Sequence, residues 1–263
     1  MLHDGEEPYL TTQEKPFSGA IFFSGCSLKC VYCQNWQISN SAKIGKQISA
    51  KTLAKVFKNL EAAGAANIDL VTPTHYAKQI VSALKIYKPK VPVIYNTSGW
   101  ETTSTIEQIL LYVDIFLFDL KYYSDALATA YSNAPHYFKF ASQAVKLAAK
   151  AKPNIYQNGQ LTQGVVIRHM CLPNNTADSN KILDWIASNL GSQVNISLLS
   201  QYTPMHKASL YPQINRPLTP LEYKAVISHA KSLKLNNVMC QELSSATCDF
   251  VPDWSDIGEQ FFN

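Results

Sequence analysis

Three cysteines lie close together near the start of the chain, in the segment Cys26-Ser-Leu-Lys-Cys30-Val-Tyr-Cys33. Thiolates at such short spacing are typical ligands of a metal centre, and a closed structural centre normally has four protein ligands. An iron–sulfur cluster held by three cysteines leaves one iron without a protein ligand, and that iron can bind a substrate or cofactor. The segment therefore predicts chemistry at a metal.

Two other interpretations of these cysteines are open at this point. A zinc site would need a fourth ligand, and the next histidine along the chain is His75. A disulfide would suit an oxidising compartment, but half of the six cysteines lie in one short segment, which favours a metal. The other three, Cys171, Cys240 and Cys248, are far apart in the sequence, so we interpret them as free or buried thiols.

The composition is typical of a globular cytoplasmic protein. Of the 263 residues, 46% are hydrophobic, and the formal net charge is only +4. The 23 lysines and arginines form no long run, so nucleic acid is not an expected partner. No apolar run approaches the roughly 18 residues of a membrane span, and the first residues are acidic where a signal peptide would be basic. We therefore expect a cytoplasmic protein with no membrane partner.

Six apolar runs, several of them apolar almost throughout, are candidates for strands that are covered on both faces. They are residues 17–24, 67–72, 91–97, 114–120, 164–170 and 194–200. Segments with helical periodicity lie between them, and some carry clear start signals. Ser49 is a candidate N-cap, and Thr219-Pro220-Leu-Glu222 has the pattern of a capping box with proline in the first turn.

Six strand–helix repeats predict a parallel sheet with right-handed crossovers, but they are too few for a closed barrel of eight strands. We therefore predict an α/β fold, a partial (β/α)6 TIM-like barrel in a single domain. The cysteines follow the first strand, in a long loop over about residues 26–48, where such folds place active groups. We predict an irregular N-terminal segment over 1–16, a core over 17–240 and a C-terminal tail over 241–263 that packs on the core.

The cysteine segment resembles the signature of the radical S-adenosylmethionine (SAM) superfamily, in which Cys-x-x-x-Cys-x-aromatic-Cys follows the first strand. Residues 22–39 as a whole are similar to the branch known as pyruvate formate-lyase activating enzyme-like. Five later segments resemble that branch as well, and the resemblance covers roughly residues 5–245. These segments are 70–75, 95–99, 119–121, 166–169 and 199–204.

The resemblance implies that Cys26, Cys30 and Cys33 bind a [4Fe–4S] cluster whose fourth iron is chelated by SAM. An electron from the reduced cluster cleaves SAM, and the resulting 5′-deoxyadenosyl radical removes a hydrogen atom from a substrate. A one-electron donor such as flavodoxin or ferredoxin is therefore an expected partner. For the activating-enzyme branch, the implied substrate is a protein, a glycyl radical enzyme whose target is a glycine Cα hydrogen.

The resemblance also implies cofactor-binding roles for other residues. Tyr32 matches the aromatic residue beside the adenine of SAM, and Gln201 follows the sixth strand, where adenine contacts are expected. Asn96 and Ser98 lie at the end of the third strand, where polar groups reach the ribose or the methionine. Arg168, at the end of the fifth strand, is expected to pair with the methionine carboxylate, or alternatively with an internal Asp or Glu.

Two further strand ends complete the predicted site. Most relatives carry Gly-Gly-Glu at the end of the second strand and bind the methionine amine there, but this chain has no carboxylate at that place. The hydroxyls of Thr72 and Thr74 are the candidate acceptors instead. Asp119 and Lys121 match the Asp-Leu-Lys of activating enzymes, where they face the substrate. A purely structural Asp119–Lys121 pair is the alternative.

Two other functions stay open. One is radical modification of a small molecule or a nucleic-acid base. The other is a non-enzymatic protein whose iron–sulfur or zinc centre is structural or senses redox state. His75, His169 and His206 lie at or near strand ends, and we interpret them as hydrogen-bonded structural residues, because an imidazole ring readily satisfies loop carbonyls.

Overall fold

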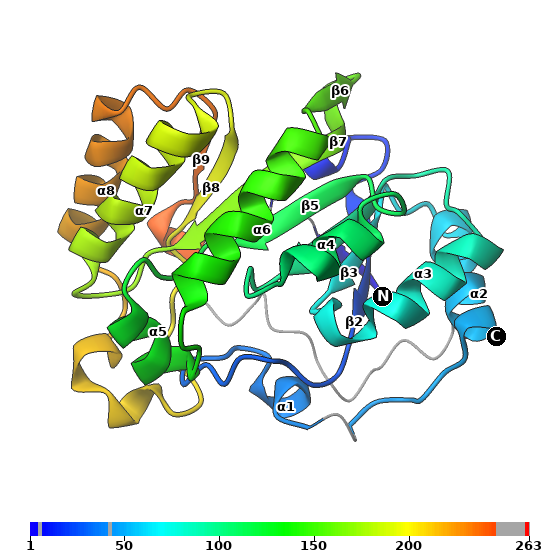
Figure 1. Cartoon of the computed structure of the whole chain (residues 1–263), viewed down its shortest axis with the longest axis horizontal. Helices are drawn as coiled ribbons and strands as arrows, with labels where there is room; N and C mark the ends of the chain where they lie inside the picture. Colours follow the sequence, from blue (N-terminus) through cyan, green and yellow to red (C-terminus); the bar gives the residue numbers. More distant parts are fainter. Residues whose placement is uncertain (5–6, 42–43, 246–260, 263) are drawn as a thin grey trace.

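The structure is a computed structural model that describes residues 1–4, 7–41, 44–245 and 261–262. Its centre is a sheet in which the strands follow the order β1-β2-β3-β4-β5-β7-β8-β9, with β6 paired to β7 (Figure 1). All neighbouring pairs from β2 to β9 along this order are parallel, and β1 and β6 are antiparallel to their partners. The strands are β1 Leu2–Asp4, β2 Phe17–Phe22, β3 Ile68–Val71, β4 Val93–Thr97, β5 Ile115–Asp119, β6 Ile155–Gln157, β7 Gln160–Met170, β8 Asn195–Leu199 and β9 Val238–Cys240.

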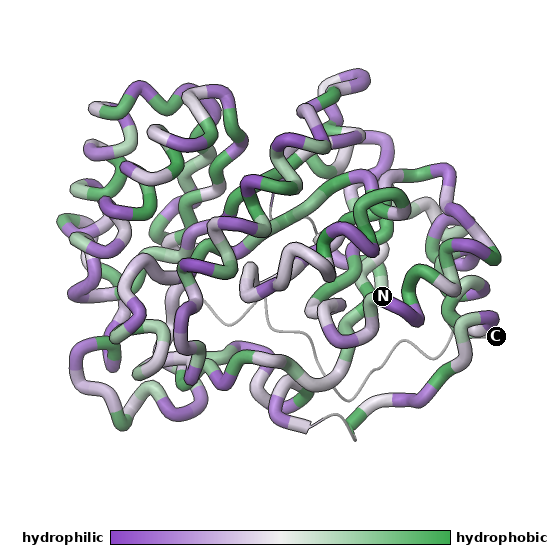
Figure 2. Tube along the Cα trace, viewed as in Figure 1, coloured by the Kyte–Doolittle hydropathy of each residue, from purple (hydrophilic) through white to green (hydrophobic). Residues whose placement is uncertain are grey.

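Helices connect the parallel strands, so the chain alternates between strand and helix as the sequence predicts. Figure 2 shows strands that are largely hydrophobic and helices in which hydrophilic and hydrophobic residues alternate. A curved, open sheet with these crossovers is a partial (β/α) barrel in a single α/β domain, which confirms the predicted fold class. The helices are α1 Trp36–Ser39, α2 Ala50–Ala62, α3 Ala77–Ile86, α4 Thr103–Ile109, α5 Asp125–Ser132, α6 Tyr137–Ala151, α7 Thr176–Leu190 and α8 Pro220–Ser232.

Two hydrophobic clusters lie on opposite faces of the sheet. The larger one fills the space between the strands and the helices. The smaller one lies inside the barrel and includes Ile94, Leu117 and Val166. Because side chains alternate along a strand, the residues two positions further on, Asn96, Asp119 and Arg168, share this inner face. The barrel interior is therefore apolar in its lower part and polar where the strands end.

The predicted helix starts are present. The Ser49 hydroxyl accepts a hydrogen bond from the Thr52 amide at 3.1 Å, and this bond caps α2. At the start of α8, the Thr219 side chain and the Glu222 carboxylate form the predicted reciprocal capping box. These bonds satisfy amides that the first turn of a helix leaves without partners.

Three short strands were not predicted. Residues 2–4, expected to be irregular, form β1, which pairs with β2 so that Leu2 lies opposite Gly19. β6 and β9 are equally short, and β9 extends the parallel sheet beyond the six predicted strands. Three-residue segments carry too little periodicity to identify, and their conformation depends on pairing with a longer neighbour.

The predicted tail over 241–263 lies mostly outside the described residues. Of its described part, Leu243, Phe261 and Phe262 pack against the larger cluster, and the Asn59 side-chain amide donates to the Phe261 carbonyl oxygen at 3.1 Å. The proposed division into segment, core and tail stays a prediction. Among the described residues, no helix has the length and apolar character that a membrane span requires.

Candidate active site

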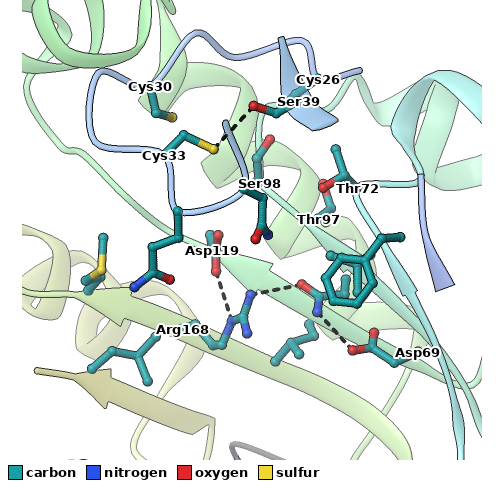
Figure 3. Close-up of a pocket in the computed structure, with 18 of the residues that line it drawn as sticks. Cys26, Cys30, Cys33, Ser39, Asp69, Thr72, Thr97, Ser98, Asp119 and Arg168 are labelled. Atoms are coloured by element: carbon teal, nitrogen blue, oxygen red, sulfur yellow. Dashed lines mark hydrogen bonds and ion pairs between the residues drawn. The ribbon is translucent and has the colours of Figure 1, made fainter. Parts of the chain in front are cut away.

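A cavity of about 230 Å³ opens at the end of the barrel where the parallel strands terminate (Figure 3). Eleven of the twelve predicted site residues line it, and they come from the loop after β2 and from the ends of β3, β4, β5, β7 and β8. They are Cys26, Cys30, Tyr32, Cys33, Thr72, Asn96, Ser98, Asp119, Lys121, Arg168 and Gln201. The twelfth, Thr74, does not line the cavity. The topology thus brings together residues from across the sequence, as parallel α/β folds do.

Backbone hydrogen bonds fix the loop that carries the cysteines. The Lys29 amide donates to the carbonyl oxygen of Ser132 at 2.9 Å, and the Val31 amide donates to that of Tyr131 at 2.8 Å, both at the end of α5. The Val31 carbonyl oxygen accepts from the amide of Lys207 at 2.8 Å, and Lys207 lies in the segment after β8. The loop is therefore attached on both sides and does not depend on a bound metal for these contacts.

The three thiols have the chemistry of cluster ligands. Cys26, Cys30 and Cys33 are all free and all face the cavity. Burial raises the pKa of Cys26, and it raises that of Cys30 to about 12, although the Lys121 charge and a hydrogen bond from Ser132 oppose the rise. Such thiols ionise when metal cations compensate their charge.

A site for a single metal ion would place its ligands differently. In the part of the chain that the structure describes, no three His, Cys, Asp or Glu side chains are arranged to hold one metal ion. The thiolates of a cluster bind separate irons and need not converge on one point. Three free thiols on one fixed loop therefore fit a cluster with three protein ligands.

A network of polar side chains crosses the barrel below the cysteines (Figure 3). The Asp119 carboxylate accepts from Arg168 Nε at 2.9 Å and from Lys121 Nζ at 2.7 Å. Arg168 Nη2 donates to Asn96 Oδ1 at 2.9 Å, and Asn96 Nδ2 donates to Asp69 Oδ2 at 3.1 Å. The internal carboxylate considered as an alternative partner of Arg168 is thus present, and it is Asp119.

The charges of this network are retained in spite of burial. The side chains of Asp119, Lys121 and Arg168 are only 20%, 18% and 14% exposed. Burial by itself raises the pKa of Asp119, but the charges of Arg168 and Lys121 outweigh it and hold that pKa below its usual value. Burial likewise opposes the charge of Lys121, whose pKa is nevertheless raised because Asp119 is so close. With Asp69, which bonds Asn96 and also lines the cavity, the network holds two cationic and two carboxylate side chains.

The phenol of Tyr137, the first residue of α6, joins the ends of β4 and β5. Its oxygen lies 2.8 Å from the Ser98 carbonyl oxygen and 2.7 Å from that of Asp119, so its proton is shared between them. It also accepts from the Lys121 amide at 2.9 Å. Gly99 packs against this junction with a positive φ of 81°. The predicted residues Ser98, Asp119 and Lys121 therefore owe their positions to a tyrosine that no sequence motif identifies.

Replacing Gly99 by alanine is expected to disturb this junction strongly. A Cβ at Gly99 would overlap the Asp119 carbonyl oxygen and lie 3.0 Å from the Tyr137 hydroxyl. Gly159 is a matched control, because its φ is 83° and a Cβ there meets nothing within 4 Å. We expect Gly159→Ala to cost only the backbone strain, about 1–2 kcal/mol, and Gly99→Ala to cost clearly more. Urea unfolding of both variants measures this, and equal losses would show that the junction has room to relax.

The two threonines near the end of the second predicted strand have features that the sequence does not predict: a backbone conformation at Thr72 and a hydrogen bond at Thr74. Thr72 has a φ of 60°, which is rare for a β-branched residue and is typical of functional sites. The Thr74 hydroxyl instead donates to Glu101 Oε1 at 2.6 Å, as the Thr97 hydroxyl does at 2.5 Å. Glu101 is only 2% exposed, and burial raises its pKa. Thr74 does not line the cavity, and its hydroxyl proton is donated to Glu101, so its role as an acceptor for the cofactor stays a prediction.

His169 is a hydrogen-bonded structural residue, as the sequence predicts, and His75 Nε2 lies 3.0 Å from the Ser24 carbonyl oxygen. The His206 ring stacks on Trp36, so the hydrogen bond expected for it stays a prediction. His169 is buried with a pKa lowered by burial, and its ring nitrogens bond the Leu120 carbonyl oxygen at 2.7 Å and the Ser179 hydroxyl at 2.8 Å. Cys171 is a buried free thiol and Cys240 an exposed one, while Cys248 lies outside the described residues.

Four residues of the site were missed by sequence reasoning. Asp69 carried a usable signal, because it is a carboxylate inside the otherwise apolar strand Ile68–Val71, just as Arg168 is a cation that follows an apolar run. Tyr122, Ser132 and Tyr137 carried none, since buried tyrosines and serines are common in helices and loops.

A partial (β/α) barrel with three free thiols on its first loop, beside a polar cavity at the strand ends, defines an enzyme class built around an iron–sulfur cluster. The family model of the radical SAM superfamily matches residues 20–186. The chain therefore belongs to the radical SAM superfamily. It is also 30% identical over 245 residues to an uncharacterised protein of Methanocaldococcus jannaschii, an alignment that covers 89% of this chain and 67% of the relative.

Solved structures share the fold. SuiB of Streptococcus suis, determined with its precursor peptide SuiA, superposes with a TM-score of 0.58 at 11% identity, over 85% of this chain and 48% of SuiB. Methylornithine synthase (PylB) superposes with a TM-score of 0.56 at 15% identity, over 85% of this chain and 70% of that enzyme. At these identities the likeness concerns the fold alone. The chain spans about half the length of SuiB.

Proposed function

We propose that Cys26, Cys30 and Cys33 hold a [4Fe–4S] cluster and that SAM binds beside it in the cavity. When bound, these groups supply the reductive cleavage that yields a 5′-deoxyadenosyl radical able to remove hydrogen from a substrate. The observation that carries the proposal is that the three thiols and the triad of Asp119, Lys121 and Arg168 face one cavity. A reducing, cytoplasmic location and a one-electron donor such as flavodoxin or ferredoxin suit this chemistry.

The chain's own residues would bind and enclose the cofactor. Arg168 lines the cavity, and its planar guanidinium suits pairing with the methionine carboxylate, with Asn96 beside it. Tyr32 and Tyr202 form a wall, with their rings edge to face at 5.6 Å, against which an adenine can pack. Below them, the apolar side chains of Ile94 and Leu117 line the cavity and keep water away from a reactive radical.

The decisive test is anaerobic incubation of the reconstituted, reduced protein with SAM. We expect about four irons with sulfide per chain, and 5′-deoxyadenosine and methionine as products. One zinc without sulfide would favour the structural-metal alternative. A loaded and reduced cluster that yields neither product would contradict the radical assignment.

For the substrate, we propose a glycine Cα hydrogen in a protein, as the resemblance to activating enzymes implies. A glycine presents no side chain to block access, and its radical is delocalised between two amides. The complex of SuiB with its precursor peptide supports only that the fold accommodates peptide chains. A candidate glycyl radical enzyme labelled with α-deuterated glycine tests this, because deuterium should appear in 5′-deoxyadenosine. Turnover with a small molecule or nucleobase and none with the labelled protein would contradict it.

A further inference from the structure

A chain of three buried hydroxyl groups connects the cavity wall to one of the cysteines. Ser132 Oγ donates a hydrogen bond to Cys30 Sγ at 3.0 Å. The Tyr122 hydroxyl lies 2.7 Å from Ser132 Oγ, and the Tyr32 hydroxyl is hydrogen-bonded to that of Tyr122. Tyr32 lines the cavity, so the chain runs from the proposed adenine wall to a proposed cluster ligand.

The direction of these hydrogen bonds follows from the number of protons. A hydroxyl has one proton to donate, and a metal-bound thiolate can only accept. Ser132 uses its proton on Cys30, so Tyr122 must donate to Ser132, and Tyr32 must donate to Tyr122. All three O–H dipoles therefore point towards the sulfur of Cys30.

The surroundings strengthen this arrangement. Ser132, Tyr122 and Tyr32 are only 0%, 1% and 4% exposed, so bulk water does not compete for their protons. In a medium of low polarity, successive hydrogen bonds polarise one another and become stronger. The backbone of Ser132 also holds the cysteine loop, because its carbonyl oxygen accepts from the Lys29 amide at 2.9 Å. The hydroxyl is thus fixed in place relative to Cys30.

We propose that Ser132, oriented by Tyr122 and Tyr32, is a positioning residue that raises the reduction potential of the cluster bound at Cys30. On reduction the cluster gains one electron from its donor, no proton moves, and negative charge on the thiolate sulfur increases. A hydrogen bond to that sulfur stabilises the reduced form more than the oxidised one. This proposal rests on the proposed function, because it requires the cluster.

The test is the midpoint potential of the reconstituted full-length protein, followed by EPR during titration with dithionite. For Ser132→Ala we expect full iron and sulfide content and a more negative midpoint. A roughly tenfold change in the one-electron equilibrium corresponds to about 59 mV. Ser132→Thr keeps the hydroxyl and should restore most of the potential. Tyr122→Phe leaves the Ser132 donor but removes its polarising partner, so its shift should be smaller and in the same direction.

Tyr223→Phe is the matched control. It also removes a buried tyrosine hydroxyl, but one that donates to the Leu198 carbonyl oxygen at 2.8 Å and bonds no sulfur. We expect its midpoint to equal that of the unaltered protein. Unchanged potentials in Ser132→Ala, or equal shifts in Ser132→Ala and Tyr223→Phe, would overturn the proposal and leave the proposed function standing. If Ser132→Ala fails to load the cluster, Tyr122→Phe decides in the same way. An unaltered protein that binds no sulfide-containing cluster would overturn both.

Discussion

Replacing Cys30 by alanine is expected to abolish both the iron–sulfur cluster and the cleavage of SAM. Cys30 lies between the other two cysteines, and its sulfur is held by Ser132 on a loop with fixed backbone bonds. Two thiolates on that loop cannot hold a cluster that needs three, and without the cluster no electron reaches the sulfonium. Iron and sulfide analysis, the visible absorption of the cluster and the yield of 5′-deoxyadenosine should fall together to background.

Cys171 and Cys240 supply the controls for this experiment. Both are free thiols, one buried and one exposed, and neither lines the cavity. Cys171→Ala removes one buried sulfur and should cost about 1 kcal/mol of stability while most of the cleavage remains. Cys240→Ala should leave stability and cleavage close to their original values. Loss of the cluster in either variant, with the Cys30→Ala protein still loaded, would mean that the ligands have been misassigned.

Asp119→Ala is expected to destabilise the folded protein by about 3–5 kcal/mol, because removing one member of a buried charge group leaves its partners without compensation. Arg168 and Lys121 both pair with Asp119, and their side chains are only 14% and 18% exposed. Urea unfolding at neutral pH measures the loss. Asp184→Ala is a suitable control, because Asp184 is 52% exposed and pairs with His229 at the surface, where such pairs contribute about 0–1 kcal/mol.

The stability lost in Asp119→Ala is expected to depend on pH, and the direction follows from the pKa of Asp119. The folded protein holds the pKa of Asp119 below that of an unfolded aspartate, about 3.9. The stabilisation from its charge is therefore complete above that value and is lost as the pH falls through the lower, folded pKa. The stability difference between the unaltered protein and Asp119→Ala should shrink in acid. A difference that stays constant to low pH would show that Asp119 acts through packing rather than charge.

The fold was largely predictable because its signals are repeated and local. A strand such as β5 is buried on both faces, so its sequence is apolar up to its last residue, Asp119. Helix caps such as Ser49 and Thr219 mark the segments between strands. β1 and β9 escaped prediction because three residues carry no periodicity and become strands only beside β2 and β8.

The site was predictable in its positions and less so in its contacts. Strand ends meet at one edge of a parallel sheet, so Asn96, Asp119 and Arg168 could be expected to lie together. Their mutual pairing could not be deduced, because it depends on the distances across the barrel. For the same reason, the hydrogen bond between Thr74 and Glu101 could not be predicted. Glu101 comes from the next strand–helix connection and carried no recognisable motif.

The polar network across the barrel has a consequence for how this active site can diversify. Hydrogen bonds join Asp69, Asn96, Asp119 and Arg168 to one another. A substitution at any one of them therefore leaves buried polar groups of its neighbours without hydrogen-bond partners. Variation in substrate choice is therefore easier at lining positions outside the network. Directed evolution of a new specificity should accumulate its first substitutions at apolar lining positions such as Met170 and Leu199, and reach the network only through paired changes.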